Sequence, residues 1–237
     1  MIIGRTLQNN GTPIKGTGIE IDPGGPTAEL LRQSVTPLTS NPLNGDYVTL
    51  LELPEQTNGE YLKGLLISHK NASGPPKHYH PSYYEDFEII EGEFEFFLNG
   101  KNKILSAGDA LSVKPGDIHT FRATDSNPVN VYAVTIHPPS EWLIPLVNTL
   151  AGLAHEGKLS KKGEPNFWQA MAFGKELRED TIFTSPPLPI QKVMNALFGP
   201  IALMLGYQAT YSKYMDNRYW TSRVEQKKVY EEQHEER

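Results

Sequence analysis

The 237-residue sequence contains no cysteine. This absence excludes disulfide bonds, thiol nucleophiles and zinc sites built from thiolates. Basic clusters are also missing, and the formal net charge is −6, so nucleic acid is not expected as a partner. Neither a glycine-rich phosphate loop nor a Gly-x-Ser-x-Gly turn is present. The enzyme classes left open are those that a metal ion can support.

Long apolar segments are absent as well. The first residues lack the apolar run of a signal peptide, which predicts a cytoplasmic protein. Residues 193–212 carry no charge, but Gly199-Pro200 and several polar side chains interrupt them. A membrane-spanning helix needs about 20 predominantly apolar residues. We therefore expect a buried or interface helix that is broken near Gly199-Pro200 rather than a membrane-spanning one, and a membrane is the less favoured partner.

Short β-like segments follow one another between residues 46 and 138, separated by Gly, Pro and Asn. Asn99-Gly100 predicts a two-residue hairpin turn, because both central positions of that turn need positive φ. Gly92 lies inside a strand-like run, which indicates a bulge or a close backbone approach. Short strands at regular spacing favour a mainly β sandwich or barrel.

The chain divides into three segments by pattern. Residues 1–45 are rich in Gly, Pro, Thr and Asn and are expected to wrap the barrel, which spans residues 46–138. Residues 139–237 form an α-helical C-terminal extension in this scheme, with Asn166 as one N-cap and a charged end, 225–237, that frays. The extension is expected to cover the barrel mouth, form a homodimer interface or touch a membrane surface, and the sequence does not choose among these roles.

Four residues form a candidate metal-ligand set. His78 and His80 are two positions apart, so on a strand they project to the same face. Pro81-Ser82 indicates a bend, after which Glu85 can return to that face. Antiparallel pairing would place His119, which follows a turn, beside the others. A His-x-His pair alone is weak support, and each residue alone could be a surface or core residue, so the joint pattern carries the hypothesis.

This joint pattern resembles the two motifs of the cupin superfamily. The matching residues of the first motif are His78, His80, Glu85 and Gly92, and those of the second are Gly108, Gly116 and His119. The departures from the motifs are Ala72 for a glycine, Lys114 for a proline and Ala123 for an asparagine. None of these departures falls on a ligand.

The resemblance implies a double-stranded antiparallel β-barrel, or jelly roll, with one divalent metal ion inside one end. Mixed imidazole and carboxylate ligands suit Fe, Mn, Ni, Cu, Co or Zn. The expected partner is a small-molecule ligand. Because fold does not determine function, three hypotheses about the function of the protein stay open. They are a metal-dependent dioxygenase acting on a small organic or aromatic substrate, a non-catalytic metal-binding or small-molecule-binding protein, and a metal-assisted isomerase or lyase.

Overall fold

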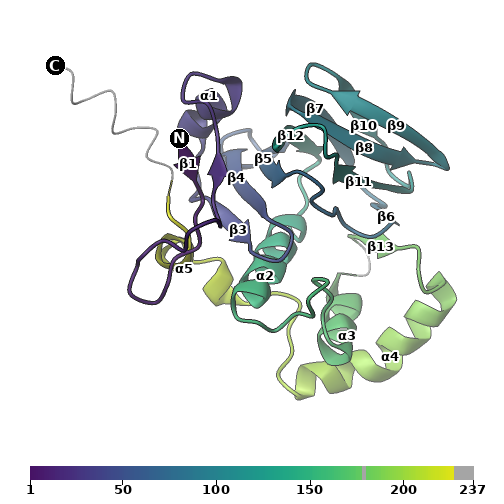
Figure 1. The fold of residues 1–237 in the computed structure, drawn as a ribbon. Coiled ribbons are helices and arrows are strands. Elements are labelled where there is room, and N and C mark those ends of the chain that lie inside the picture. Colours follow the sequence, from purple (N-terminus) through teal and green to yellow (C-terminus); the bar gives the residue numbers. More distant parts are fainter. Residues whose placement is uncertain (178–179, 227–237) are drawn as a thin grey trace.

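Two antiparallel β-sheets form the upper part of the molecule (Figure 1). The computed structural model describes residues 1–177 and 180–226. The six-stranded sheet has the order β10 (Ala110–Val113), β7 (Tyr84–Glu91), β12 (Val129–His137), β5 (Leu62–His69), β4 (Asp46–Glu52), β3 (Thr39–Asn41). The five-stranded sheet has the order β13 (Ile182–Phe183), β6 (His78–Tyr79), β11 (His119–Ala123), β8 (Glu93–Leu98), β9 (Lys101–Ser106). This arrangement confirms the mainly β, jelly-roll class.

Aromatic side chains from both sheets fill the space between them. Phe87 and Tyr132 belong to the six-stranded sheet, and Phe94 and Phe96 to the five-stranded sheet; all four are buried. Phe87 lies edge-to-face against Phe96, with ring centroids 5.0 Å apart. Phe94 meets Tyr132 in the same way at 5.2 Å. Edge-to-face contacts align the ring quadrupoles favourably, so these rings form the barrel core.

Two glycine positions shape the five-stranded sheet as predicted. Asn99 and Gly100 join β8 to β9 with φ of 47° and 86°, the values a tight hairpin turn needs. Gly92, between β7 and β8, has φ of +73°. A Cβ at this position would lie 2.4 Å from Oδ1 of Asn130 and 2.6 Å from the carbonyl oxygen of Val129, which confirms the close backbone approach.

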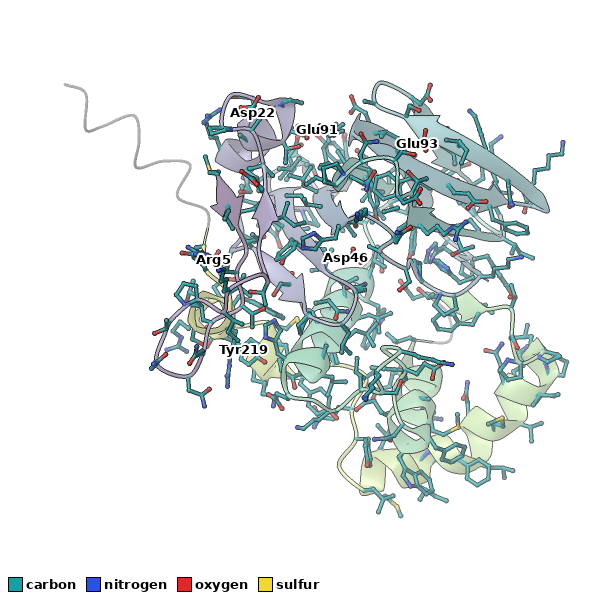
Figure 2. The ribbon with its side chains drawn as sticks, viewed as in Figure 1. Arg5, Asp22, Asp46, Glu91, Glu93 and Tyr219 are labelled. Atoms are coloured by element: carbon teal, nitrogen blue, oxygen red, sulfur yellow. The ribbon has the colours of Figure 1, made fainter. Side chains whose placement is uncertain are left out.

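The N-terminal segment packs on the face of the six-stranded sheet that points away from the aromatic core. Its elements are β1 (Ile2–Ile3), β2 (Ile19–Glu20) and α1 (Pro26–Gln33). Ile3, Ile19 and Leu31 are buried in one cluster with Ile67 of β5. The segment also binds the other end of the chain, because the Arg5 guanidinium donates to Glu225 at 2.5 and 2.8 Å; Figure 2 labels Arg5. The domain boundaries at residues 45 and 138 stay a prediction.

Helices dominate the C-terminal part, as predicted. They are α2 (Leu143–His155), α3 (Phe167–Glu176), α4 (Leu188–Met204), the 3₁₀ helix η1 (Ser212–Tyr214) and α5 (Asn217–Arg223). The Asn166 side chain accepts from the Gln169 amide at 3.0 Å, so it is the expected N-cap of α3. The start of α2 packs on the barrel through Leu143 and Ile144. The predicted fraying of residues 225–237 concerns a segment that lies mostly outside the described residues.

The predicted break in α4 was wrong, because the helix continues through Gly199 and Pro200. Proline removes one intrahelical hydrogen bond, but contacts with α3 compensate: Phe198 packs on Trp168, and the Asn195 amide donates to the Gly174 carbonyl at 2.8 Å. Figure 1 shows α3 on one side of α4 and open space on the other. The opposite face is not buried, since Val193 and Leu197 are each 59% exposed. Among the described residues, no helix has the length and hydropathy to cross a membrane.

Candidate metal centre

Strands β6 and β11 bring two histidines together. His78 and His119 are directly paired across these antiparallel strands, and their ring centroids lie 4.2 Å apart. His80 follows His78 by two residues, and those two ring centroids lie 4.8 Å apart. The His-x-His spacing thus places both rings on one face, and strand pairing adds the third ring, as the sequence predicted.

Glu85 reaches the three imidazoles from the other sheet. The chain bends at Pro81 and Ser82 and then enters β7, where Glu85 pairs with Val113 and Ile136. Its Oε2 lies 2.8 Å from Nε2 of His119 and 3.4 Å from Nε2 of His80. The four predicted residues therefore meet at the end of the barrel where the two sheets approach each other.

The geometry of these four groups fits a metal ion. The candidate ligand atoms all lie within 4.8 Å of one another, and the four residues are at most 7% exposed. Two ligands at right angles, each about 2.1 Å from one ion, lie about 3 Å apart. Nε2 of His80, Oε2 of Glu85 and Nε2 of His119 are buried without a hydrogen bond of acceptable geometry. Buried polar atoms are rarely left without a partner, and a shared cation would satisfy all three.

The contacts of Nδ1 determine which nitrogen of each histidine ring faces the centre. Nδ1 of His78 lies 2.8 Å from the Pro76 carbonyl oxygen, Nδ1 of His119 lies 3.0 Å from that of Asp117, and Nδ1 of His80 lies 3.1 Å from that of Asp180. A carbonyl oxygen only accepts, so each neutral ring carries its proton on Nδ1. The Nε2 lone pairs are then free for coordination, as in many metal sites.

Burial and mutual charge shift the protonation of the cluster. Burial, reinforced by the charges of His119 and His80, lowers the pKa of His78 to about 3. Burial raises the pKa of Glu85, but the neighbouring His119 and His80 outweigh it and hold that pKa well below its usual range. Burial lowers the pKa of His119, yet contact with Glu85 gives a net increase. The centre thus combines a carboxylate with one imidazole, that of His119, whose pKa is raised above the ordinary value.

Two residues behind His80 were not predicted as part of the site. Tyr83 stacks on the His80 ring at 4.3 Å between centroids, and Asp180 supplies the carbonyl contact described above. Both also line a cavity of about 380 Å³ between the barrel and the helices, which the four candidate ligands do not line. Tyr83 is close to His80 in sequence, but Asp180 lies 100 residues away, and no sequence spacing indicates it.

The remaining described histidines stay apart from this cluster. His137 pairs with Asp86 at 2.7 Å on the barrel surface, and Nε2 of His155 lies 3.0 Å from Oγ of Ser40. His69 contacts the Tyr47 ring. None of these three is in the group of described residues that could hold a metal ion. His234, also given no role, lies outside the described residues.

The paired sheets and the buried His and Glu cluster at one end define a cupin-type barrel. Residues 64–135 match the Cupin domain family, so this segment of the chain is a cupin domain.

Similarity to characterised proteins is local. An oxidoreductase from Arthrobotrys oligospora is 36% identical over 56 residues, which are 23% of this chain and 22% of that protein. The epoxidase atD from Aspergillus terreus is 38% identical over 63 residues, 26% of this chain and 20% of that protein. The chain therefore matches only about a fifth of the length of these relatives.

Solved structures with similarity to this chain include two bacterial proteins. KdgF from Halomonas sp. is 20% identical with a TM-score of 0.36, covering 40% of this chain and 81% of that chain. An RmlC-like cupin from Shewanella frigidimarina is 24% identical with a TM-score of 0.38, covering 46% of this chain and 88% of that chain.

Proposed function

We propose that His78, His80, Glu85 and His119 bind one divalent transition metal ion, and that the protein is a metal-dependent oxidoreductase, a dioxygenase, acting on a small organic molecule. One observation carries the metal site: Nε2 of His80, Nε2 of His119 and Oε2 of Glu85 converge in a buried space without a hydrogen bond of acceptable geometry, while the Nδ1 atoms of all three histidines face carbonyl oxygens. Imidazole and carboxylate ligands suit Fe, Mn, Ni, Cu, Co or Zn.

The charge and the number of the four ligands suit redox chemistry at the ion. Three neutral imidazoles and one carboxylate offset only part of a divalent charge and occupy four positions, which leaves sites free on a five- or six-coordinate ion. When bound, a redox-active ion supplies Lewis acidity and one-electron chemistry with dioxygen. The names of the two curated relatives, an oxidoreductase and an epoxidase, point to the same class of reaction.

A small-molecule substrate is part of the proposal. The cavity of about 380 Å³ lies within the range of small-molecule sites. Tyr83 and Trp142 line it together with charged residues such as Lys175, a mixture that suits a small organic molecule with an aromatic and a polar part. Tyr83 also contacts His80, so the cavity is adjacent to the proposed metal centre.

One observation favours a second candidate function, a non-catalytic metal-binding protein. The ligand residues are almost fully buried, His119 completely so, and the cavity does not reach them. Such enclosure is expected of an ion that is held for binding or structure. A metal-assisted isomerase or lyase is the third proposal, and it would need a general base beside the ion.

Elemental analysis of protein purified without a metal-affinity step tests these proposals. We expect about one equivalent of iron, manganese, nickel or copper, lost in His80→Ala and retained in His137→Ala, since His137 lies outside the cluster. Dioxygen consumption with a panel of small aromatic compounds then separates an oxygenase from a binding protein. Zinc would argue against the oxygenase, and equal metal content in all three proteins would refute the metal site.

A cytoplasmic location and a homodimer complete the proposal. The location rests on the sequence alone. The homodimer is supported by the outer stripe of α4, whose members are Ile190, Val193, Leu197, Ile201 and Met204. These side chains are 39–82% exposed on one face of the helix.

A further inference from the structure

The chain between α3 and α4 pairs with the strand that carries the His-x-His pair. β13 lies antiparallel to β6, with Phe183 opposite His78 and Ile182 opposite Tyr79. The Thr184 amide extends this pairing by donating to the Lys77 carbonyl at 3.0 Å. Strand β6 is only two residues long and lies between β11 and β13. A ligand-bearing strand this short depends on both neighbours for its position.

Asp180, just before β13, accepts hydrogen bonds from three hydroxyl groups, two of which also lie against Nδ1 of His80. Its carboxylate accepts from Thr181 at 2.9 Å, from Tyr83 at 3.4 Å and from Ser140. The Tyr83 oxygen lies 2.5 Å from Nδ1 of His80, and the Thr181 oxygen lies 3.3 Å from it. A chain of contacts thus runs from His80 Nδ1 through the Tyr83 hydroxyl to the Asp180 carboxylate.

The donors in this chain have one consistent direction. Nδ1–H of His80 donates to the Tyr83 oxygen or to the Asp180 carbonyl, and the Tyr83 and Thr181 hydroxyls donate to the Asp180 carboxylate. Tyr83 and Asp180 are buried, at 2% and 8% exposure. A buried carboxylate behind a ligating imidazole orients the ring and makes its Nε2 more basic, which strengthens coordination.

We infer that Tyr83 and Asp180 are positioning residues for His80, and that the C-terminal extension thereby completes the metal centre. The inference rests on the proposed metal site and adds to it a requirement that lies outside the cupin motifs. It assigns the segment 180–183 a role in metal binding as well as in packing. The barrel alone would then hold the ion less tightly than the whole chain does.

Full-length Tyr83→Phe and Asp180→Asn test the inference, with Tyr84→Phe as the matched control. Tyr84 is the next residue, is 37% exposed and stacks on His137 away from the cluster. Chelator competition with Cu²⁺ or Co²⁺ should show dissociation constants 10–100-fold higher for Tyr83→Phe and Asp180→Asn, the range typical of lost partners behind a ligand. Tyr84→Phe should match wild type.

The spectrum of the bound ion distinguishes positioning from general stabilisation. The electron paramagnetic resonance spectrum of the Cu²⁺-loaded protein should change in Tyr83→Phe and Asp180→Asn and stay unchanged in Tyr84→Phe. The metal-free variants could instead melt at a lower temperature and yet show wild-type metal affinity and, once loaded, the wild-type spectrum. That result would overturn the inference and leave the proposed metal site intact. Wild-type protein that binds no metal would overturn both. If Tyr83→Phe does not fold, Asp180→Asn, which keeps the side-chain volume, decides the question alone.

Discussion

At the scale of single residues, Glu85 is the group on which the centre depends most. It brings the one carboxylate into a cluster of three imidazoles and is 7% exposed. A buried carboxylate is costly unless it is paired or hydrogen-bonded, and Oε2 of Glu85 lies 2.8 Å from Nε2 of His119 and 3.4 Å from Nε2 of His80. Contact with Glu85 raises the pKa of His119, and an ion shared with the histidines would replace the proton on His119 as the positive partner of the buried carboxylate.

Glu85→Gln should separate charge from shape. The substitution keeps nearly the same volume but removes the negative charge that offsets the charge of the ion. We expect metal affinity to fall at least about tenfold, an effect of about 1.4 kcal/mol, while the far-UV circular dichroism stays that of the wild type. Isothermal titration with Co²⁺ measures the affinity. Wild-type affinity in Glu85→Gln would mean that the carboxylate is not a ligand.

The proton held by His119 predicts how metal affinity depends on pH. Contact with Glu85 raises the pKa of His119 above the ordinary imidazole value of 6.5 in the metal-free protein. Metal binding must displace this proton, so affinity should fall about tenfold per pH unit below the pKa of His119. The decline should begin above pH 6.5 as the pH is lowered. His78 should not contribute, because burial lowers its pKa to about 3.

Chelator competition between pH 8.5 and 5 measures this dependence, and nuclear magnetic resonance of the His119 ring in metal-free protein measures its pKa directly. The two should agree within their errors. An affinity that stays constant down to pH 5 would show that His119 binds no proton that competes with the ion, and would contradict the assigned pairing with Glu85.

At the scale of elements, the turn between β7 and β8 requires glycine more strictly than the hairpin between β8 and β9. Gly92 and Gly100 both have positive φ, but a Cβ meets backbone and side-chain atoms only at Gly92. Gly92→Ala should therefore cost about 3 kcal/mol of unfolding free energy, combining backbone strain with overpacking, whereas Gly100→Ala should cost about 1 kcal/mol. Urea unfolding measures both. Equal losses would show that the contact with Asn130 relaxes without cost.

Local patterns in the sequence were enough to predict several elements. The His-x-His spacing, the Asn99-Gly100 turn and the Asn166 cap each depend on a few neighbouring residues, and the structure has them as expected. Continuity of α4 could not be predicted in this way, because packing against α3 outweighs the local effect of Pro200. The contribution of Asp180 could not be predicted from local patterns either, because its contact with His80 joins residues 100 positions apart.

At the scale of the whole molecule, the N-terminal segment and the C-terminal extension contact each other as well as the barrel. The N-terminal segment contacts the C-terminal segment through Arg5 and Glu225, and the Leu38 amide donates to the Gln226 side chain at 2.8 Å. On the opposite side, β13 joins the five-stranded sheet next to the ligand strand β6. The C-terminal extension is thus attached to the rest of the chain at two separate places, the N-terminal segment and the barrel, which favours a single cooperative unit.

The outer stripe of α4 is an apolar face that the described residues leave uncovered. Its five apolar residues are spaced by three or four positions and so lie along one side of the helix, and Lys192 is the only charged residue of α4. Contiguous exposed apolar patches of this kind mark interaction sites. An uncharged face lacks the lysines and arginines of helices that bind anionic membranes. A second copy, placed across a two-fold axis, would match the stripe with itself.

The stripe predicts that the wild-type protein is a dimer in solution and that Leu197→Glu is a monomer. Leu197 lies in the middle of the stripe and is 59% exposed, so a charge there is tolerated by the monomer but is buried against its own copy in a two-fold dimer. Light scattering after gel filtration measures the mass. Ile104→Glu is the matched control, because Ile104 is similarly exposed, at 50%, on β9 and away from α4. A monomeric wild type, or a dimer that persists in Leu197→Glu, would show that α4 has another role. Loss of the dimer in Ile104→Glu would place the interface on the edge of the barrel.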